Sequence, residues 1–338
     1  MNLSEFEVIQ ELCNTNELVF PRDGVRLGIG DDGAVLSLPQ GRDLVLAMDT
    51  AVANIHFPAD APAEFIAHRV LVANLSDIAA MGAQPLSFTL SLVAPEVKQD
   101  WLGNFASGLA RLAQLHDCPL VGGDVSQGPL IITIEVQGVI DPGAVITRSG
   151  AQTGDSILVT GYPGDAALGL ALLRPEFSEY AASLDPASLS SAQRQHLEAA
   201  YFQSEPRLAF GMGCAHLVNS GIDISDGLDG DLKHILRASG RGAVVDLEAL
   251  PCSAAALACT DKKTSAAAAL FGGDDYELCF TAPPERLPRL QELAAEIDLP
   301  LHCIGKIVAD AGLKYRDGHG QAVQFSQQSY THFRSGAR

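Results

Sequence analysis

Apolar residues alternate with polar ones in some segments of the chain and recur at helical spacing in others. Residues 86–93 alternate throughout, which predicts a half-buried strand. Residues 62–81 begin at Pro62, carry Glu64 in the first turn and repeat apolar residues with helical period, so they predict a helix that Gly82 ends. The first half is further expected to form a buried strand, a second helix and a β-branched strand, at 43–49, 97–115 and 130–140.

A connection rich in glycine and proline divides the chain. Asp141 to Asp155 contains Pro142 and three glycines, which indicates a domain boundary near residue 150. Strands and helices are expected on both sides of it, so the chain should be an α/β or α+β protein with domains 1–150 and 151–338. The later strands are predicted at 156–160, 243–247, 276–281 and 301–308, and the later helices at 164–173, 190–202, 206–218 and 227–239. The alanine-rich residues 253–270 fit either a helix or a loosely ordered segment.

The composition indicates an acidic globular protein, with 47% hydrophobic residues and a net charge of -19 from 41 acidic and 22 basic side chains. Nucleic acid is disfavoured as a partner, because phosphate binding needs a basic surface. No stretch approaches about 18 uninterrupted apolar residues, so no membrane span is expected. The seven cysteines are odd in number and lack Cys-x-x-Cys spacing, and Met1 to Glu11 lack signal-peptide features. We therefore expect reduced thiols and a cytoplasmic location.

The segment from Gly28 to Gly33 matches Gly-x-Gly-x-x-Gly, a pattern that binds dinucleotides when a helix follows. Here a strand-like stretch closed by Pro39 follows instead, so we reject that interpretation. Asp31 and Asp32 would also repel a phosphate unless Mg²⁺ lay between them. The simpler alternative is a glycine turn with solvated aspartates.

Two further aspartates of the first half stand at positions that favour ligand binding. Asp49 ends the predicted strand 43–49, and strand ends are where α/β proteins bind ligands. Asp77 lies in the otherwise apolar helix 62–81, where a carboxylate is costly unless it is paired or bound to metal. The simpler alternatives are a turn cap for Asp49 and a solvent-facing position for Asp77.

Three more motifs combine carboxylates with glycines, at 121–124, 222–228 and 271–278. The first places Gly123 and Asp124 directly after an apparent buried strand, where paired glycines allow close approach of a ligand. In the second, Ser225 or Asp226 could simply cap the following helix. The third holds three carboxylates within four residues and reads as one dense acidic site. Because Mg²⁺ prefers carboxylates completed by substrate phosphates, the whole set predicts a site for Mg²⁺ and a triphosphate.

The order of these motifs resembles that of thiamine-monophosphate kinases, from about residue 5 to Tyr330-Thr331-His332-Phe333. No Walker motif and no protein-kinase signature is present. The resemblance implies the two-domain aminoimidazole-ribonucleotide-synthetase-like fold, with a mixed sheet and helices in the N-terminal domain. It implies an ATP/Mg-binding and dimerisation domain at 1–150, a domain at 151–338 that completes the site, and a homodimer. The implied reaction converts ATP and thiamine monophosphate to ADP and thiamine diphosphate by direct transfer.

The resemblance also implies roles for individual residues. Magnesium ligands would be Asp32, Asp49, Asp77, Asp124, Asp223 and Asp226, with Asp31 as a neighbouring candidate. Nucleotide contacts would come from Gly123, Asp124, Arg148 and Ser225, and the catalytic residues would be Asp77, Asp124 and Arg148. The substrate side would consist of His56, Asp274 and Tyr330.

The sequence departs from the family pattern at three places. Met48 stands where a threonine is frequent, Asp274 where a glutamate is frequent, and 202–207 carry less arginine and proline. Other enzymes of the superfamily remain alternatives, namely the amidine-forming synthetase of purine synthesis and selenophosphate synthetase. The second needs a reactive cysteine followed by glycine and lysine, whereas Cys13 precedes asparagine. A non-catalytic magnesium or nucleotide sensor is the alternative from a different class.

Overall fold

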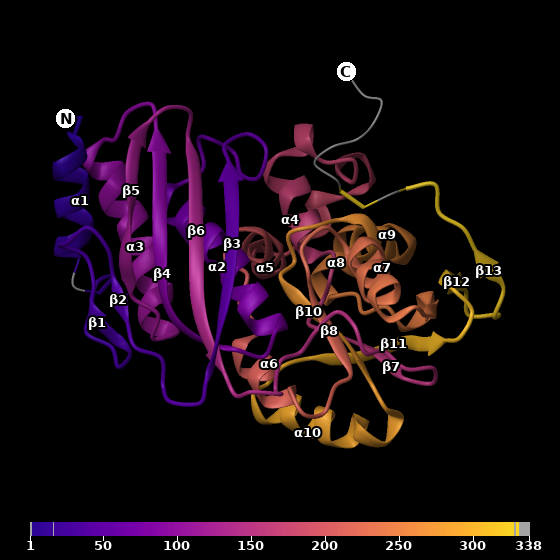
Figure 1. The fold of residues 1–338 in the computed structure, drawn as a ribbon. Helices are drawn as coiled ribbons and strands as arrows, with labels where there is room; N and C mark the ends of the chain where they lie inside the picture. Colours follow the sequence, from indigo (N-terminus) through magenta and orange to yellow (C-terminus); the bar gives the residue numbers. More distant parts are fainter. Residues whose placement is uncertain (1, 16, 328, 331–338) are drawn as a thin grey trace. The chain divides into compact units, whose positions relative to one another are not determined.

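The computed structural model describes residues 2–15, 17–327, 329 and 330. The chain folds into two compact units, both of which are drawn in Figure 1. The N-terminal unit is Met1–Ile78 with Ala83–Val145, and the C-terminal unit is Ala79–Gly82 with Ile146–Arg338. Each unit contains a sheet and helices, which confirms the expected mixture of strands and helices in both halves.

The N-terminal unit is built on a four-stranded sheet in the order β3-β6-β4-β5. Its strands are β3 (Asp43–Val52), β4 (Gln84–Ala94), β5 (Leu120–Gln127) and β6 (Ile131–Ile140). Strand β6 is antiparallel to both neighbours, and β5 is parallel to β4. Figure 1 shows α2 (Ala63–Ala80) and α3 (Gln99–Leu115) behind this sheet. The remaining elements are α1 (Glu5–Asn14) and the hairpin of β1 (Val25–Leu27) and β2 (Val35–Leu36).

One face of this sheet is buried and the other is open. Leu90, Leu92 and Ile134 are buried, whereas the residues between them are only partly covered. The open face of β3 presents Leu44, Leu46 and Met48. The prediction of a strand at 43–49 was therefore confirmed, but its predicted burial was wrong. Its apolar residues look like a buried run, but β3 is an edge strand and only alternate side chains face the helices.

The C-terminal unit holds a seven-stranded sheet in the order β13-β12-β9-β11-β7-β10-β8. These strands are β7 (Ser156–Thr160), β8 (Ser220–Ile224), β9 (Gly242–Asp246), β10 (Glu277–Ala282), β11 (Leu301–Val308), β12 (Gly312–Arg316) and β13 (Ala322–Val323). The helices are α4 (Asp165–Leu173), α5 (Ser191–Phe202), α6 (Leu208–Cys214), α7 (Leu228–Ser239), α8 (Ala254–Cys259), α9 (Lys262–Phe271) and α10 (Leu287–Glu296). Figure 1 shows α7, α8 and α9 on one side of this sheet and α6 and α10 on the other.

The alanine-rich segment forms the two helices α8 and α9, which resolves the alternative left open by the sequence. Ser253 caps the first by accepting from the Ala256 N–H, and Asp261 caps the second by accepting from the Thr264 N–H. Both helices contribute to a hydrophobic core of the C-terminal unit, which contains Leu168, Leu232 and Leu270. Among the described residues, no helix is both long enough and apolar enough to cross a membrane.

Candidate functional site

Asp49 and Asp77 lie in one neighbourhood of the N-terminal unit. The backbone N–H of Asp49 donates to Oδ1 of Asn74 at 3.0 Å, and Nδ2 of Asn74 donates to the carbonyl of Val70 at 3.0 Å. The buried Asn74 therefore ties β3 to α2. Asp77 is three residues further along α2 and partly buried, so it lies on the same side of the helix.

Asp124 lies apart from that pair within one chain. The hydroxyl groups of Thr50 and Thr133 are 2.8 Å apart, Thr133 pairs with Ser91, and Ser91 pairs with Asp124. All four side chains therefore share the open face of the sheet, and Asp49, next to Thr50, points to the opposite face. Three strand spacings, roughly 14 Å, separate β3 from β5. The sheet thus keeps Asp124 away from Asp49 in the same chain.

Gly123 and Asp124 lie inside β5 rather than after a strand, which corrects the prediction from the sequence. A side-chain carbon on Gly123 would lie 1.9 Å from the carbonyl oxygen of Leu90. The glycine is therefore required by the neighbouring strand β4, whether or not a ligand binds there. Asp124 is exposed, and its Oδ2 accepts from the hydroxyl of Ser126 at 3.0 Å.

The Gly-x-Gly-x-x-Gly loop connects β1 and β2, so a strand follows it and the rejection of a dinucleotide fingerprint is confirmed. Asp31 and Asp32 are exposed in this loop, and Oδ1 of Asp31 accepts from the N–H of Asp32 at 2.9 Å. His56 lies after β3, where its Nδ1 accepts from the N–H of Val52 at 2.9 Å. In this arrangement the ring is neutral and carries its proton on Nε2.

The C-terminal unit gathers carboxylates where β8 ends and α7 begins. Asp223 is the buried penultimate residue of β8, and the chain then passes through Ser225 and Asp226. Oδ2 of Asp231 accepts from the N–H groups of Ser225 at 3.0 Å and Asp226 at 3.1 Å, so Asp231 fixes the loop. Burial, together with the negative charges of Asp223 and Asp226, raises the pKa of Asp231 to about 8. Such a concentration of carboxylates suits a divalent cation.

Arg148 belongs to the same region. Its carbonyl accepts from the hydroxyl of Ser239, the last residue of α7, at 3.3 Å. Burial lowers the pKa of His234 on α7, the charge of Arg148 lowers it further, and Asp226 opposes this. Arg148 and Asp226 are therefore both within electrostatic range of His234, and the arginine side chain is exposed.

Asp274 is held against the same loop. Its N–H donates to the carbonyl of Ser225 at 2.8 Å, and the N–H of Tyr276 donates to the carbonyl of Ile224 at 2.9 Å. Asp274 has a left-handed backbone with φ 72°, and a side-chain carbon on Gly273 would lie 2.5 Å from the carbonyl oxygen of Ser225. The glycine is thus needed for the close approach of the two loops.

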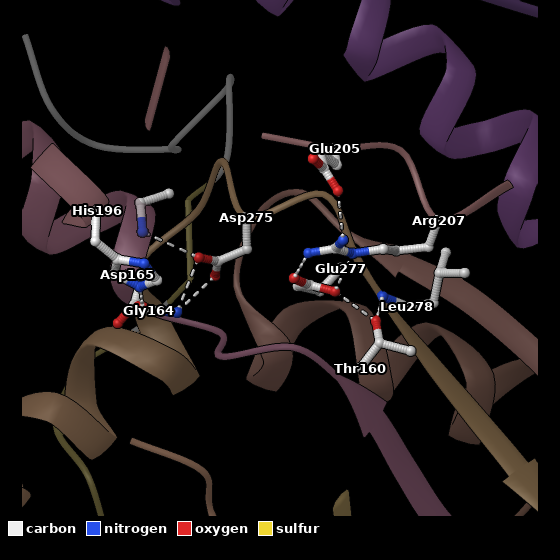
Figure 2. Close-up of polar contacts among 10 residues, drawn as sticks. Thr160, Gly164, Asp165, His196, Glu205, Arg207, Asp275, Glu277 and Leu278 are labelled. Atoms are coloured by element: carbon white, nitrogen blue, oxygen red, sulfur yellow. Dashed lines mark hydrogen bonds and ion pairs between the residues drawn. The ribbon is translucent and has the colours of Figure 1, made fainter. Parts of the chain in front are cut away.

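The three carboxylates of 271–278 do not form one acidic site, which corrects the expectation from the sequence. Figure 2 shows Asp275 and Glu277 turned toward other partners. Asp275 is buried and accepts from the N–H of Gly164 at 2.8 Å, and burial raises its pKa well above the ordinary value. Glu277 is also buried and binds Arg207 and Thr160 (Figure 2). Both side chains support the structure, and Asp274 alone remains with the carboxylate loop.

A cavity of about 340 Å³ adjoins Asp275 and Glu277. His196 contributes to its wall and lies 2.7 Å from Asp165 through Nε2 and Oδ2 (Figure 2). None of the site residues expected from the sequence lines this cavity.

Tyr330 lies beside the carboxylate loop, and its N–H points to the carbonyl of Asp226 at 3.4 Å. The rest of the terminal motif, Thr331-His332-Phe333, lies outside the described residues.

Two residues of the site were missed from the sequence. Asn74 stood in a noted motif but was given no role, although its amide is what joins α2 to β3. Asp231 lies on the buried stripe of α7 that Leu228, Leu232 and Ile235 define. A carboxylate on such a stripe is costly unless it is satisfied, so this position was a usable signal.

Within the part of the chain that the structure describes, no group of three or more histidine, cysteine, aspartate or glutamate side chains is arranged to coordinate a metal ion. Mg²⁺ needs no such cage, because it usually binds one or two carboxylates and completes its shell with phosphates and water. The carboxylates at Asp49 and Asp77 and those at Asp223 and Asp226 fit that kind of open donor set.

Comparison with known proteins identifies the family. Residues 30–140 match the AIR synthase related protein, N-terminal domain, and residues 152–318 match the corresponding C-terminal domain. The thiamine-monophosphate kinase of Salmonella typhimurium is 41% identical over 313 residues, which cover 91% of this chain and 92% of that protein.

Solved structures agree with this assignment. The thiamine-monophosphate kinase of Stenotrophomonas maltophilia K279a has a TM-score of 0.83 at 37% identity, covering 96% of this chain and 99% of that one. AaThiL complexed with AMPPCP and TMP has a TM-score of 0.73 at 28% identity, covering 98% and 97%. This confirms the resemblance seen in the sequence: the chain belongs to the thiamine-monophosphate kinase family of AIR synthase related proteins.

Proposed function

We propose that this chain transfers the terminal phosphoryl group of ATP to thiamine monophosphate, giving ADP and thiamine diphosphate, the last step of thiamine diphosphate synthesis. The thiamine-monophosphate kinases that it resembles over nearly their whole length support this, as does the AaThiL complex with AMPPCP and TMP. The observation that carries the proposal is the loop at 223–226, because its backbone holds both Asp274 and Tyr330. Groups assigned to the metal and nucleotide thereby adjoin groups assigned to the acceptor.

The proposed reaction needs positioning and charge neutralisation more than a strong base. The acceptor is a phosphate monoester that is already largely ionised at neutral pH. One of its oxygens attacks the γ-phosphorus of ATP, and the bond from that phosphorus to the β,γ-bridging oxygen breaks, so that ADP leaves. Arg148 and Ser225 are proposed to contact the nucleotide, and the arginine charge offsets repulsion between the two polyanions.

Magnesium ions are proposed to accompany ATP. Bound Mg²⁺ supplies positive charge that neutralises the phosphates as charge shifts during transfer. In the N-terminal unit its ligands would be Asp31, Asp32, Asp49, Asp77 and Asp124, and in the C-terminal unit Asp223 and Asp226. Met48 cannot supply a side-chain oxygen here, so a contact at that position would use its backbone carbonyl. Asp77, Asp124 and Arg148 are the residues to which we assign catalysis.

The acceptor side is proposed to consist of His56, Asp274 and Tyr330. The neutral ring of His56 presents a proton on Nε2, which can donate to a phosphate oxygen. Asp274 is one methylene shorter than the glutamate frequent in the family, and its left-handed backbone next to Ser225 fixes the direction in which it projects.

A homodimer through the N-terminal sheet is proposed as the working form. The open face of β3 carries Leu44, Leu46 and Met48 at 43%, 57% and 64% exposure. Contiguous apolar surface on a sheet favours association with a second copy. Asp124 projects from this same face, so the proposed dimer would bring it to the interface. The seven free thiols support the expected cytoplasmic setting.

An acceptor panel tests the proposed function. The protein, Mg²⁺ and ATP are incubated with thiamine monophosphate, thiamine, formylglycinamide ribonucleotide with an ammonia source, or selenide, and release of ADP or AMP is followed. Release that depends on thiamine monophosphate alone is expected. Release that depends on one of the other compounds would replace this function with that of another superfamily member, and release with none of them would favour a sensor.

A further inference from the structure

The chain after β13 crosses the start of α7 and is fastened there by Ser329. Its Oγ accepts from the N–H of Gly230 at 2.9 Å, and the residue is only 9% exposed. A side-chain carbon on Gly230 would lie 2.9 Å from Cβ of Ser329, so the two backbones approach as closely as glycine allows.

An aromatic contact fastens the same segment at its other end. The ring of Phe325 meets Phe271 edge to face, with 5.2 Å between centroids, and meets Tyr315 in the same manner at 5.3 Å. Phe271 is the last residue of α9 and leads directly into the loop that carries Asp274. The hydroxyl of Tyr315 donates to Asp229 at 2.6 Å. The segment is therefore joined to both loops of the C-terminal site.

Tyr330 follows the Ser329 anchor and is presented to the surface rather than buried. The residue is 42% exposed, while its N–H points to the carbonyl of Asp226. A tyrosine at the surface combines an apolar ring with a hydroxyl group, which suits contact with a ligand that has both apolar and polar parts.

We propose that Ser329 is a positioning residue that holds Tyr330 beside Asp226 and thereby sets the affinity for the acceptor substrate. This rests on the proposed function, in which Tyr330 contacts thiamine monophosphate. Ser329 acts only through Tyr330: its hydroxyl is occupied by Gly230 and its side chain is covered. The nucleotide, which we assign to Arg148 and Ser225, does not depend on this anchor.

The substitution Ser329→Ala isolates the anchor, because it removes one oxygen and keeps the buried β-carbon. The N–H of Gly230 also donates to the carbonyl of Gly227 at 3.0 Å, so it keeps a partner in the variant. The fold should consequently be preserved, with little change in Tm. Ser326→Ala is the matched control, since it removes an exposed hydroxyl from the same segment.

Five proteins are compared by steady-state kinetics, by calorimetric titration of thiamine monophosphate without ATP, and by hydrogen exchange at the backbone amide of residue 330. They are the wild type, Ser329→Ala, Tyr330→Ala, the double variant and the control Ser326→Ala. Losing one hydrogen bond predicts that Ser329→Ala raises KM and Kd for thiamine monophosphate about two- to tenfold. KM for ATP and kcat should stay within about twofold, and exchange at Tyr330 should accelerate. The double variant should be no worse than Tyr330→Ala, because the serine acts through the tyrosine.

Unchanged affinity in Ser329→Ala, equal effects on both substrates, or additive losses in the double variant would each overturn the proposal. Wild-type protein that forms no thiamine diphosphate would instead overturn the proposed function, and the exchange measurement would still report on the anchor.

Discussion

Arg207 binds both carboxylate oxygens of Glu277, with Nε at 2.8 Å from one and Nη2 at 2.5 Å from the other. Glu277 also accepts from the hydroxyl of Thr160 at 2.6 Å, so one buried carboxylate joins β7, β10 and the start of α6 (Figure 2). This pair supports the strand that follows Asp274. Its role is structural, although Glu277 belongs to the motif that carries Asp274, which we propose to lie on the substrate side.

Glu277→Ala should therefore destabilise the fold strongly. Removing one partner of a buried ion pair costs about 3–5 kcal/mol, because the remaining charge is left unpaired. Glu205→Ala is the matched control: Glu205 also pairs with Arg207, at 3.3 Å, but is 78% exposed. Its loss should cost less than about 1 kcal/mol. Urea unfolding measures both values, and similar losses would contradict the structural role assigned to Glu277.

Much of the fold could be predicted because helices and strands leave their own periods in the sequence. Strand 156–160 and helix 62–81 were predicted within one residue of the observed ends, which are Ser156–Thr160 and Ala63–Ala80. The local sequence pattern does not show which residues of neighbouring strands pair with each other. Only the pairing of four strands reveals that Asp49 and Asp124 project from opposite faces.

The candidate site could be predicted where its residues are close together in the sequence. The carboxylates at 223–226 are near one another in sequence, and the structure keeps them together. The motif at 271–278 was misread as one acidic site, because a tight backbone separates Asp274 from Asp275 and turns the latter toward the amides of α4. Asp231 lies one turn into α7 and accepts a hydrogen bond from the Ser225 N–H. In the sequence, only its place on the buried face of the helix indicates this role.

The pair of His196 and Asp165 should make stability depend on pH. The hydrogen bond that Nε2 of His196 donates to Asp165 raises the pKa of His196, and burial opposes this. A histidine with a raised folded-state pKa stabilises the fold fully below its unfolded pKa of about 6.5 and loses that contribution as pH rises through the folded value.

His196→Gln should accordingly lower Tm more at about pH 5.5 than at about pH 9. The His196 side chain is half exposed, so the difference in the free energy of unfolding should not exceed about 1 kcal/mol, or about 2–4 °C in Tm. Calorimetry on this variant and on the exposed-site control His319→Gln checks it. A loss of Tm that is the same at both pH values would show that the charged histidine contributes nothing.

His56→Ala should weaken acceptor binding selectively. Loss of a hydrogen bond to a charged phosphate costs roughly 1.5–3 kcal/mol, which is about ten- to a hundredfold in KM for thiamine monophosphate. KM for ATP should change far less, and Asp226→Asn should instead depress kcat. Kinetics at saturating Mg²⁺ separate these effects. If His56→Ala affects both substrates equally, the acceptor side reduces to Asp274 and Tyr330.

The wild type should be a dimer at micromolar concentration, and the pair Leu46→Lys and Met48→Lys should produce monomers. Charges on this open sheet face would be desolvated by a second copy. Leu115→Lys is the control, because Leu115 is 70% exposed at the end of α3, away from the sheet face. Light scattering measures the masses. A monomeric wild type, or an unchanged dimer after both substitutions, would rule out this interface.

The central claim is transfer of the γ-phosphoryl group to thiamine monophosphate. The most direct measurement follows label from [γ-³²P]ATP in the wild type and in Asp77→Asn, whose side chain keeps its shape but loses its charge. The account predicts one labelled thiamine diphosphate for each ADP in the wild type, and a rate lower by at least about a hundredfold in Asp77→Asn at unchanged Tm. Label recovered as free phosphate, or near-normal transfer by Asp77→Asn, would contradict it.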